Sequence, residues 1–391
     1  MNPIAIPLLA LTLGHVFSNA VRTLPAVAAD VLTRDLAISA EALAGITGAF
    51  PAAFAAAMIP VGVGLDRYGV RPVALTLMAI AVLGSAIAAL APSASTLLLA
   101  QIVLGIACSG MMMCPMTYAA RAVAQEKFGL WAGVIQGVGN SGMILSASPL
   151  AWLVEVAGWR AGFWACGVLA LIAITAVFFT VPRGAPAGAE RRGIWQDARE
   201  VMAFATTPRL RGLMALAFVS FGAVLGVRGL WGGPWLMDVK GMGRIEAGHL
   251  LLACTFALVA GPALAGWVVS RFGQLRWLLV GGHLAAALFI LLLVLGGPLG
   301  IPAWADGLIL VLFGFSITFQ ILCFALLRSL VRPEEAGRAL SAQNIFFFGG
   351  AAVLQGLSGL AAAAGGVAAA LLTFAVALVV GCALFLRWQK V

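Results

Sequence analysis

Apolar residues recur along the chain in runs of roughly 20, separated by short polar stretches. A helix of about 20 residues crosses the hydrocarbon core of a bilayer, whereas a transmembrane strand needs only about ten residues of alternating polarity. The runs therefore predict an all-α membrane protein with 12 transmembrane helices. The predicted spans lie at 4–31, 41–65, 72–91, 95–120, 129–153, 160–181, 209–238, 246–270, 276–297, 302–328, 338–363 and 366–388.

The longest polar stretch divides this pattern into two sets of six spans. It contains several glycines, prolines and arginines, a composition that is typical of exposed connections. We therefore predict an N-terminal six-helix bundle over 1–182, a cytoplasmic linker over 183–208 and a C-terminal six-helix bundle over 209–391.

The two predicted bundles repeat each other in sequence. GVGLDRYGVR at 62–71 matches GWVVSRFGQL at 266–275, and VRTL around Arg22 matches VRGL around Arg228. Parallel six-helix repeats are typical of secondary transporters that bind substrate between their halves. The repeat therefore predicts that Arg22 and Arg228 occupy corresponding positions beside one substrate cavity.

Composition agrees with the membrane assignment and predicts an orientation. Hydrophobic residues make up 63% of the chain and charged residues 9%, against about 25% charged in soluble domains. Of the 23 lysines and arginines, 17 fall in loops on one side of the predicted spans, four on the other side and two within spans. Since positively charged loops stay in the cytoplasm, both termini are predicted to be cytoplasmic, which we call N-in/C-in. The net charge of +9 then reflects orientation and not nucleic-acid binding.

The two arginines within spans are the strongest functional signal. A charged side chain at the centre of a spanning helix costs about 2.5–3.5 kcal/mol on insertion scales. None of the 14 acidic residues falls in the middle of a span, so no carboxylate of the chain is an obvious partner for Arg22 or Arg228. A carboxylate or phosphate group of a substrate would compensate both, because guanidinium groups bind such anions bidentately. The alternative is that each arginine snorkels or binds backbone carbonyls of a broken helix.

Other polar positions accompany the arginines. His15, Asn19 and Arg22 lie at i, i+4 and i+7, on one face of a helix. Histidine titrates near neutral pH, so His15 is a candidate proton carrier, with a structural hydrogen bond as the alternative. Further candidates for substrate contact, for which packing between helices is the alternative, are Gln136, Asn140, Asn344 and Trp231.

A methionine-rich run, MMMCPM at Met111–Met116, raises the question of copper, since thioethers and thiolates bind Cu(I). Consecutive residues point in different directions around a helix, so packing is the favoured interpretation and no metal site is predicted. The chain carries no Walker, HExxH or catalytic-triad motif. We therefore predict neither an enzyme nor an ATP-driven pump, and no cofactor.

A charged motif connects the second and third predicted spans. It resembles the loop 2–3 motif of the major facilitator superfamily, and the resemblance extends over essentially the whole chain. It implies the fold of that superfamily and a charge network that latches one conformation. The residues that carry the motif are Gly62, Asp66, Arg67, Gly69 and Arg71.

The second half has a degenerate copy of this motif. It keeps Gly266, Arg271 and Gly273 but has Ser270 where the first copy has its acid. The resemblance therefore implies an asymmetric latch.

The first and seventh predicted spans resemble those of the organophosphate:phosphate antiporters and of sugar-phosphate-permease-like carriers. In that group one arginine from each of these spans contacts the anionic substrate, and Arg22 and Arg228 match the two positions. The fifth span departs from the pattern, because Val138 stands about where the glycerol-3-phosphate carriers have a histidine. The resemblance thus implies a small organic anion, either a carboxylate or a phosphate ester.

Together these features predict a secondary active or facilitative transporter that works by alternating access as a monomeric, multi-pass protein of a cell membrane, here the bacterial inner membrane. The coupling partner is a counter-anion or a proton. Because no carboxylate is predicted in the cavity, anion exchange or facilitated diffusion is favoured over proton symport. The alternatives are a drug or lipophile efflux transporter of the same superfamily and a non-transporting sensor of an external anion.

Overall fold

The computed structural model describes residues 4–123, 125–183, 207–332 and 336–389, together with residues 199, 201, 203 and 204. Nearly all of this part of the chain is helical, and it contains no strand. The prediction of an all-α fold is therefore confirmed.

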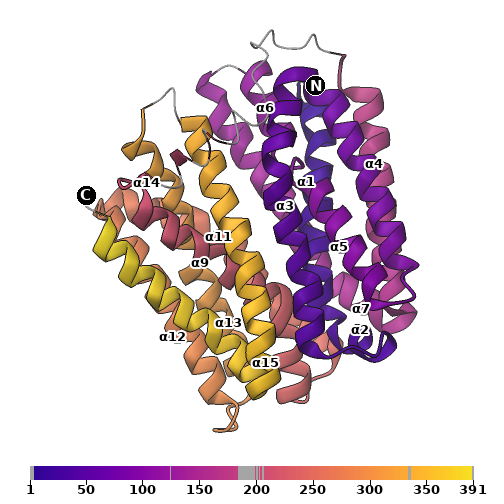
Figure 1. Ribbon diagram of the computed structural model, residues 1–391, viewed down its shortest axis with the longest axis vertical. Coiled ribbons are helices and arrows are strands. Elements are labelled where there is room, and N and C mark those ends of the chain that lie inside the picture. Colours follow the sequence, from indigo (N-terminus) through magenta and orange to yellow (C-terminus); the bar gives the residue numbers. More distant parts are fainter. Residues whose placement is uncertain are drawn as a thin grey trace.

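The helices before the predicted linker form one group, called here the first bundle (Figure 1). The predicted span 4–31 is in fact two helices that meet at Ala28, where φ is −116° and ψ is 7°. The last helix is interrupted at Gly158, where φ is +80°. The elements are α1 (Ala5–Val27), α2 (Ala29–Asp35), α3 (Ala40–Tyr68), α4 (Val70–Ala89), α5 (Ala94–Cys108), α6 (Met113–Ala122) and α7 (Gln125–Thr180).

The helices after the predicted linker form the second bundle (Figure 1). Its first helix continues into two π-helical turns, η1 and η2, and its last helix is interrupted at Gly365 and Gly366. The elements are α9 (Arg211–Gly226), η1 (Val227–Trp231), α10 (Gly232–Pro234), η2 (Trp235–Val239), α11 (Arg244–Phe272), α12 (Leu275–Gly296), α13 (Ala303–Ile317), the 3₁₀ turn η3 (Thr318–Ile321), α14 (Leu322–Leu330) and α15 (Ala336–Trp388).

Ten helices within the described residues are long and apolar enough to cross a membrane. Two of these ten, α7 and α15, each contain an internal break and therefore consist of two helices. The count of 12 spans and the N-in/C-in orientation stay predictions. The domain boundaries also stay predictions, since most of 183–208 lies outside the described residues.

The two bundles converge at one end and diverge toward the end that carries the N-terminus (Figure 1). Between the bundles, α3 packs against α15 and α7 packs against α11. Phe54 of α3 stacks on Phe348 of α15 with ring centroids 3.7 Å apart. The convergent end contains α2, and the predicted orientation assigns this end to the outside of the cell.

Within the first bundle, α1 and α7 approach each other closely because two glycines of α7 have no side chain. A Cβ at Gly142 would lie 1.9 Å from the carbonyl oxygen of Val16, and a Cβ at Gly139 would lie 1.7 Å from Cδ2 of His15. No real Cβ tolerates such distances, so only glycine fits at these two positions. Small residues are the usual means by which membrane helices achieve such contact. This packing positions the polar face of α1 against α7.

Candidate functional site

Arg22 lies on α1 at the interface between the bundles. Its Nη2 donates a hydrogen bond to Oδ1 of Asn19, one turn earlier. Its guanidinium carbon lies 5.4 Å from the ring centroid of Phe221 on α9, in the second bundle. Its Nε is buried and has no hydrogen-bond partner. Arg22 therefore retains one buried donor that an anion's oxygen can satisfy.

Asn19, on the preceding turn of α1, holds the side chain of Arg22 in position. Its amide nitrogen donates to the carbonyl of Gly139 over 2.9 Å and lies 3.4 Å from Nε2 of His15. The side chains of Asn19 and His15 are both buried. The structure thus brings three predicted site residues of α1 together and engages Asn19 with protein groups on both of its polar atoms.

Arg228 lies on η1 and is only 1% exposed. Its Nε donates to Oγ1 of Thr255 on α11 over 2.7 Å. Its Nη2 donates to the carbonyl of Met143 over 3.1 Å and lies 3.4 Å from Oγ of Ser146, both on α7 of the first bundle. Its Nη1 is buried without a hydrogen-bond partner. Arg228 therefore joins the two bundles and, like Arg22, keeps one unsatisfied N–H group.

The partners of Arg228 bear on the two explanations of its buried charge, which are binding of a substrate anion and compensation by backbone carbonyls. A backbone carbonyl and two hydroxyls supply part of its compensation, as the carbonyl interpretation of the sequence requires. No salt bridge to Arg22 or Arg228 is present in the part of the chain that the structure describes. Neutral oxygens leave the formal charge in place, so both sites still favour an anion.

The π-helical turn that carries Arg228 is a local feature that the sequence did not indicate. A π turn closes hydrogen bonds from i to i+5 and is often found at functional sites in helices. It is followed by Gly232, where a Cβ would lie 2.4 Å from the carbonyl oxygen of Val227. The wide turn thus depends on a residue without a side chain at its end.

The remaining candidate contacts occupy different environments. Gln136 and Asn140 are half-buried on α7, and the Gln136 amide donates to Oδ1 of Asn140 over 3.2 Å. Asn344 is half-buried on α15. Trp231 is buried inside the second bundle, where its Nε1 donates to Oγ of Ser358 over 2.9 Å. Their roles in substrate binding stay predictions.

Two glycines of the predicted latch have backbone conformations that L side chains rarely adopt. Gly69, between α3 and α4, has φ +84°, and Gly273, after α11, has φ +67°. Both turns therefore require glycine, in the two bundles alike. The two motif copies thus share a glycine at this position because both turns need a positive φ.

The structure describes the side chains of some charged residues of the predicted latch but not of all. Arg71 donates to the carbonyl of Phe178 on α7 over 2.7 Å and covers that ring. Arg67 is exposed over its neighbour Tyr68. The side chain of Asp66 lies outside the described residues. Of the other motif members, Gly62 is half-buried, whereas Gly266 and Arg271 are exposed.

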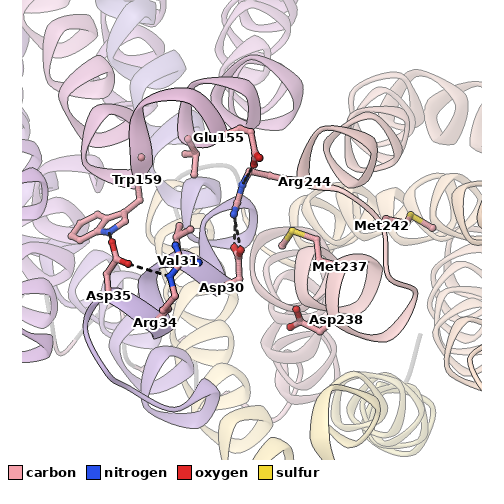
Figure 2. Close-up of a pocket in the computed structure, with 12 residues that line it drawn as sticks. Asp30, Val31, Arg34, Asp35, Glu155, Trp159, Met237, Asp238, Met242 and Arg244 are labelled. Atoms are coloured by element: carbon pink, nitrogen blue, oxygen red, sulfur yellow. Dashed lines mark hydrogen bonds and ion pairs between the residues drawn. The ribbon is translucent and has the colours of Figure 1, made fainter.

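A third arginine connects the bundles at their convergent end (Figure 2). Arg244, at the start of α11, binds both carboxylate oxygens of Asp30, with Nη1–Oδ1 2.8 Å and Nη2–Oδ2 2.6 Å. Its Nε donates to Oε2 of Glu155 on α7 over 2.8 Å, and Nη1 also donates to the carbonyl of Val27. We call Arg244, Asp30 and Glu155 the Arg244 cluster. It ties the second bundle to two helices of the first.

A cavity of about 570 Å³ opens beside the Arg244 cluster (Figure 2). On the side of the first bundle, Trp159 donates its indole N–H to Asp35 over 3.0 Å. Asp238 and Met237 line the opposite side, in the second bundle. The sequence showed that Asp30 and Glu155 lie outside the middle of any span, but it did not identify Arg244 as their partner. Arg244 is 89 residues from Glu155 and 214 from Asp30.

The methionine-rich run packs against neighbouring helices. Met111 is buried, and its sulfur would lie 2.6 Å from a Cβ at Gly14 of α1. Among the residues that the structure describes, no group of three histidine, cysteine or acidic side chains is arranged to hold a metal ion. The structure therefore adds a packing role for Met111.

Comparison with known proteins gives a family and several relatives. The model of the Major Facilitator Superfamily matches residues 11–354. The chain is 26% identical over 226 residues to the putative niacin/nicotinamide transporter NiaP of Bacillus subtilis, covering 56% of this chain and 54% of that protein. It is 28% identical over 338 residues to the tetracenomycin C resistance and export protein of Streptomyces glaucescens, covering 72% and 61%. These alignments thus span less than two thirds of either relative.

Among solved structures, a crystal structure of the nucleoside transporter NupG is similar along the whole chain. The TM-score is 0.79 at 15% sequence identity, covering 99% of this chain and 100% of that one. An identity this low establishes the shared fold and nothing about the substrate.

Proposed function

Because the chain belongs to the Major Facilitator Superfamily, we propose that it is a transporter, not an enzyme, and that it carries a small organic anion across a bilayer by alternating access. Arg22 and Arg228 bind the anionic group, which is a carboxylate or a phosphate ester. A further relative, an inner membrane transport protein of Escherichia coli, favours the bacterial inner membrane as its location.

The observation that carries this proposal is the state of the two central guanidinium groups. Each lies at the interface between the bundles, bonds only to neutral oxygens and keeps one buried N–H without a partner. A buried donor that finds no acceptor costs about 1–3 kcal/mol, and more for a charged group. An anion bound between the bundles would accept hydrogen bonds from these donors and compensate one of the two charges, or both in the case of a doubly charged phosphate ester.

The contacts of Arg228 suggest how binding is linked to movement. Its hydrogen bonds to Met143 and Ser146 link the second bundle to the first. An anion that accepts hydrogen bonds from the same guanidinium competes with these oxygens for it. Binding would therefore loosen one inter-bundle contact and favour the rocking of one bundle against the other.

The coupling partner is a counter-anion or a proton. Exchange against a second anion needs only the two arginines, whereas proton symport needs a titratable group such as His15. Uptake driven by an imposed pH gradient separates these mechanisms, and His15→Gln abolishes that drive if His15 carries the proton.

The central test is uptake of radiolabelled carboxylates and phosphate esters into proteoliposomes. We expect Arg22→Gln and Arg228→Gln each to reduce uptake by about 100-fold, since the loss of one partner of a buried charged contact costs roughly 2–5 kcal/mol. Arg387→Gln is the matched control, because Arg387 is exposed at the end of α15. Uptake at the unmodified rate in both central variants would contradict the proposal.

Export of an apolar compound is the second candidate function. It is favoured by the similarity to the tetracenomycin C resistance and export protein. Overexpression in a drug-sensitive bacterial strain tests it directly. Raised resistance that survives Arg22→Gln and Arg228→Gln would establish export as the function, because an apolar cargo needs neither arginine.

A further inference from the structure

Arg22 faces a group of phenylalanine rings in the second bundle. The nearest ring is that of Phe221, over which the guanidinium lies at 5.4 Å. The ring of Phe221 lies 4.8 Å from that of Phe348 and 6.3 Å from that of Phe347. We call the phenylalanine cluster the connected set Phe50, Phe54, Phe221, Phe324, Phe347 and Phe348, of which the first two belong to the first bundle.

The phenylalanine cluster lies at the interface between the two bundles. Phe348 stacks on Phe54 of the first bundle at an interplanar angle of 14°, and both rings are buried. Phe221 is only half-buried, although Arg22 on one side and Phe348 on the other are both interface residues. These two neighbours therefore do not cover Phe221 completely.

The helices that carry these rings are in close backbone contact. A Cβ at Gly350 of α15 would lie 1.8 Å from the carbonyl oxygen of Phe218 on α9. A Cβ at Gly222 of α9 would lie 2.6 Å from the side chain of Leu354 on α15. This close packing of α9 on α15 places the ring of Phe221 beside those of Phe347 and Phe348.

The polar groups around Arg22 offer little to a substrate with many hydroxyls. The amide of Asn19 is already used by Gly139 and by Arg22 itself. The buried Nε of Arg22 has no hydrogen-bond partner and lies beside an apolar aromatic surface. A polyhydroxylated phosphate ester would lose its hydrogen bonds to water here without replacement. A planar apolar body with a single carboxylate has fewer hydrogen bonds to water to lose, and the guanidinium restores part of them.

We propose that the substrate is an aromatic carboxylate, whose carboxylate binds Arg22 and whose ring packs against Phe221 and its neighbours in the phenylalanine cluster. This inference rests on the proposed anion transport and narrows its substrate class. An aromatic ring prefers the face or edge of other rings in a way that a saturated ring of the same size does not. The site therefore selects for planarity as well as for charge.

The experiment compares benzoate with cyclohexanecarboxylate, which has the same charge and nearly the same size but a puckered ring. Uptake of each is measured in proteoliposomes, with glycerol phosphate as a polar anion. We expect the unmodified protein to prefer benzoate over cyclohexanecarboxylate by about five- to tenfold, and to transport glycerol phosphate least. Equal rates for benzoate and cyclohexanecarboxylate would overturn the inference.

Variants of Phe221 connect this preference to the phenylalanine cluster. Phe221→Leu keeps an apolar side chain but removes the ring, so the preference for benzoate should fall toward one. Phe221→Tyr keeps the ring and should retain most of the preference. Phe179→Leu is the matched control, because Phe179 is 78% exposed on α7 and should leave both rates unchanged. An undiminished preference in Phe221→Leu, with a melting temperature that shows it is folded, would also overturn the inference.

The outcomes separate this inference from the proposal on which it rests. Transport of aliphatic carboxylates or phosphate esters at the rate of benzoate, with loss in Arg22→Gln, would leave anion transport standing and refute the aromatic substrate. Absence of uptake for all three anions, with apolar drugs exported instead, would refute anion transport itself.

Discussion

Two levels of the inter-bundle interface use arginine in opposite ways. In the Arg244 cluster, the guanidinium binds one carboxylate bidentately and a second through a single hydrogen bond. At the central level, Arg22 and Arg228 bond only to neutral oxygens. The same residue type thus makes a charge-neutralised contact at one end of the interface and an uncompensated one in its middle.

The difference follows from where water is available. The side chains of Asp30 and Glu155 are 34% and 51% exposed, so their charges remain partly hydrated. A carboxylate in the centre would lose its hydration and would occupy the arginines permanently. A transporter gains nothing from that, because its own acid would compete with every anion that enters. Under the proposed function, a central arginine without an acid would mark the place of a mobile anion.

The largest effect is expected when the central level is made to resemble the Arg244 cluster. Asn19→Asp places a carboxylate next to Arg22 and so supplies the counter-ion that Arg22 lacks among the described residues. We expect anion uptake to fall by about 100-fold, because the internal carboxylate competes with the substrate for the guanidinium. Uptake into proteoliposomes measures this. Gln274→Glu, at an exposed position between α11 and α12, controls for an added acid, and persistent uptake in Asn19→Asp would refute the comparison.

A smaller effect is expected from breaking the Arg244 cluster. Arg244→Gln removes the ties to Asp30 and Glu155 and should let the convergent end open more often, by about tenfold for a partly exposed charge pair. The measurement is the rate at which a cysteine at Val31, which lines the adjoining cavity, reacts with an impermeant maleimide. The six native cysteines are buried, so their background should be low. An unchanged rate, relative to Val31→Cys alone, would show that the cluster does not hold this end closed.

The two carboxylates of the Arg244 cluster should contribute unequally. Asp30 accepts two hydrogen bonds and is the less exposed, whereas Glu155 accepts one. We expect Asp30→Asn to raise the labelling rate at Val31→Cys by about fivefold and Glu155→Gln by less than about twofold, since bidentate pairs are the stronger ones. The reverse order would mean that the helix carrying Glu155 controls the opening.

The smallest effect concerns Trp231, which follows Arg228 by one turn but points into the second bundle. Trp231→Phe removes the hydrogen bond to Ser358 and should lower the free energy of unfolding by about 1 kcal/mol. Thermal melts of the detergent-purified protein measure this against the unmodified chain. A loss of uptake comparable to that of Arg228→Gln would instead make Trp231 a wall of the substrate site.

The helices and the central arginines could be predicted because their causes are local. Runs of apolar residues must be helical in a bilayer, since every backbone group needs an internal partner. The repeat then paired Arg22 with Arg228, and the census of acids showed that both lack a counter-ion. The turns at Gly69 and Gly273 follow equally from local sequence, because positive φ favours glycine.

What could not be predicted depends on contacts between distant segments. The partners of Arg244 belong to two other helices, and nothing in the local sequence selects them. Phe221 looked like any apolar residue of a span until its position opposite Arg22 was known. The π-helical turn at Arg228 likewise depends on packing, since its sequence is compatible with an ordinary helix.

The Arg244 cluster also makes the protein sensitive to dissolved salt. When the convergent end opens, Arg244 leaves Asp30 and Glu155, and two carboxylates face the medium without their cation. Mobile ions screen exposed charges over about 8 Å at physiological ionic strength, so a saltier medium lowers the work of that separation. Opening at this end should therefore become easier as ionic strength rises, while the buried centre around Arg228 is shielded from the change.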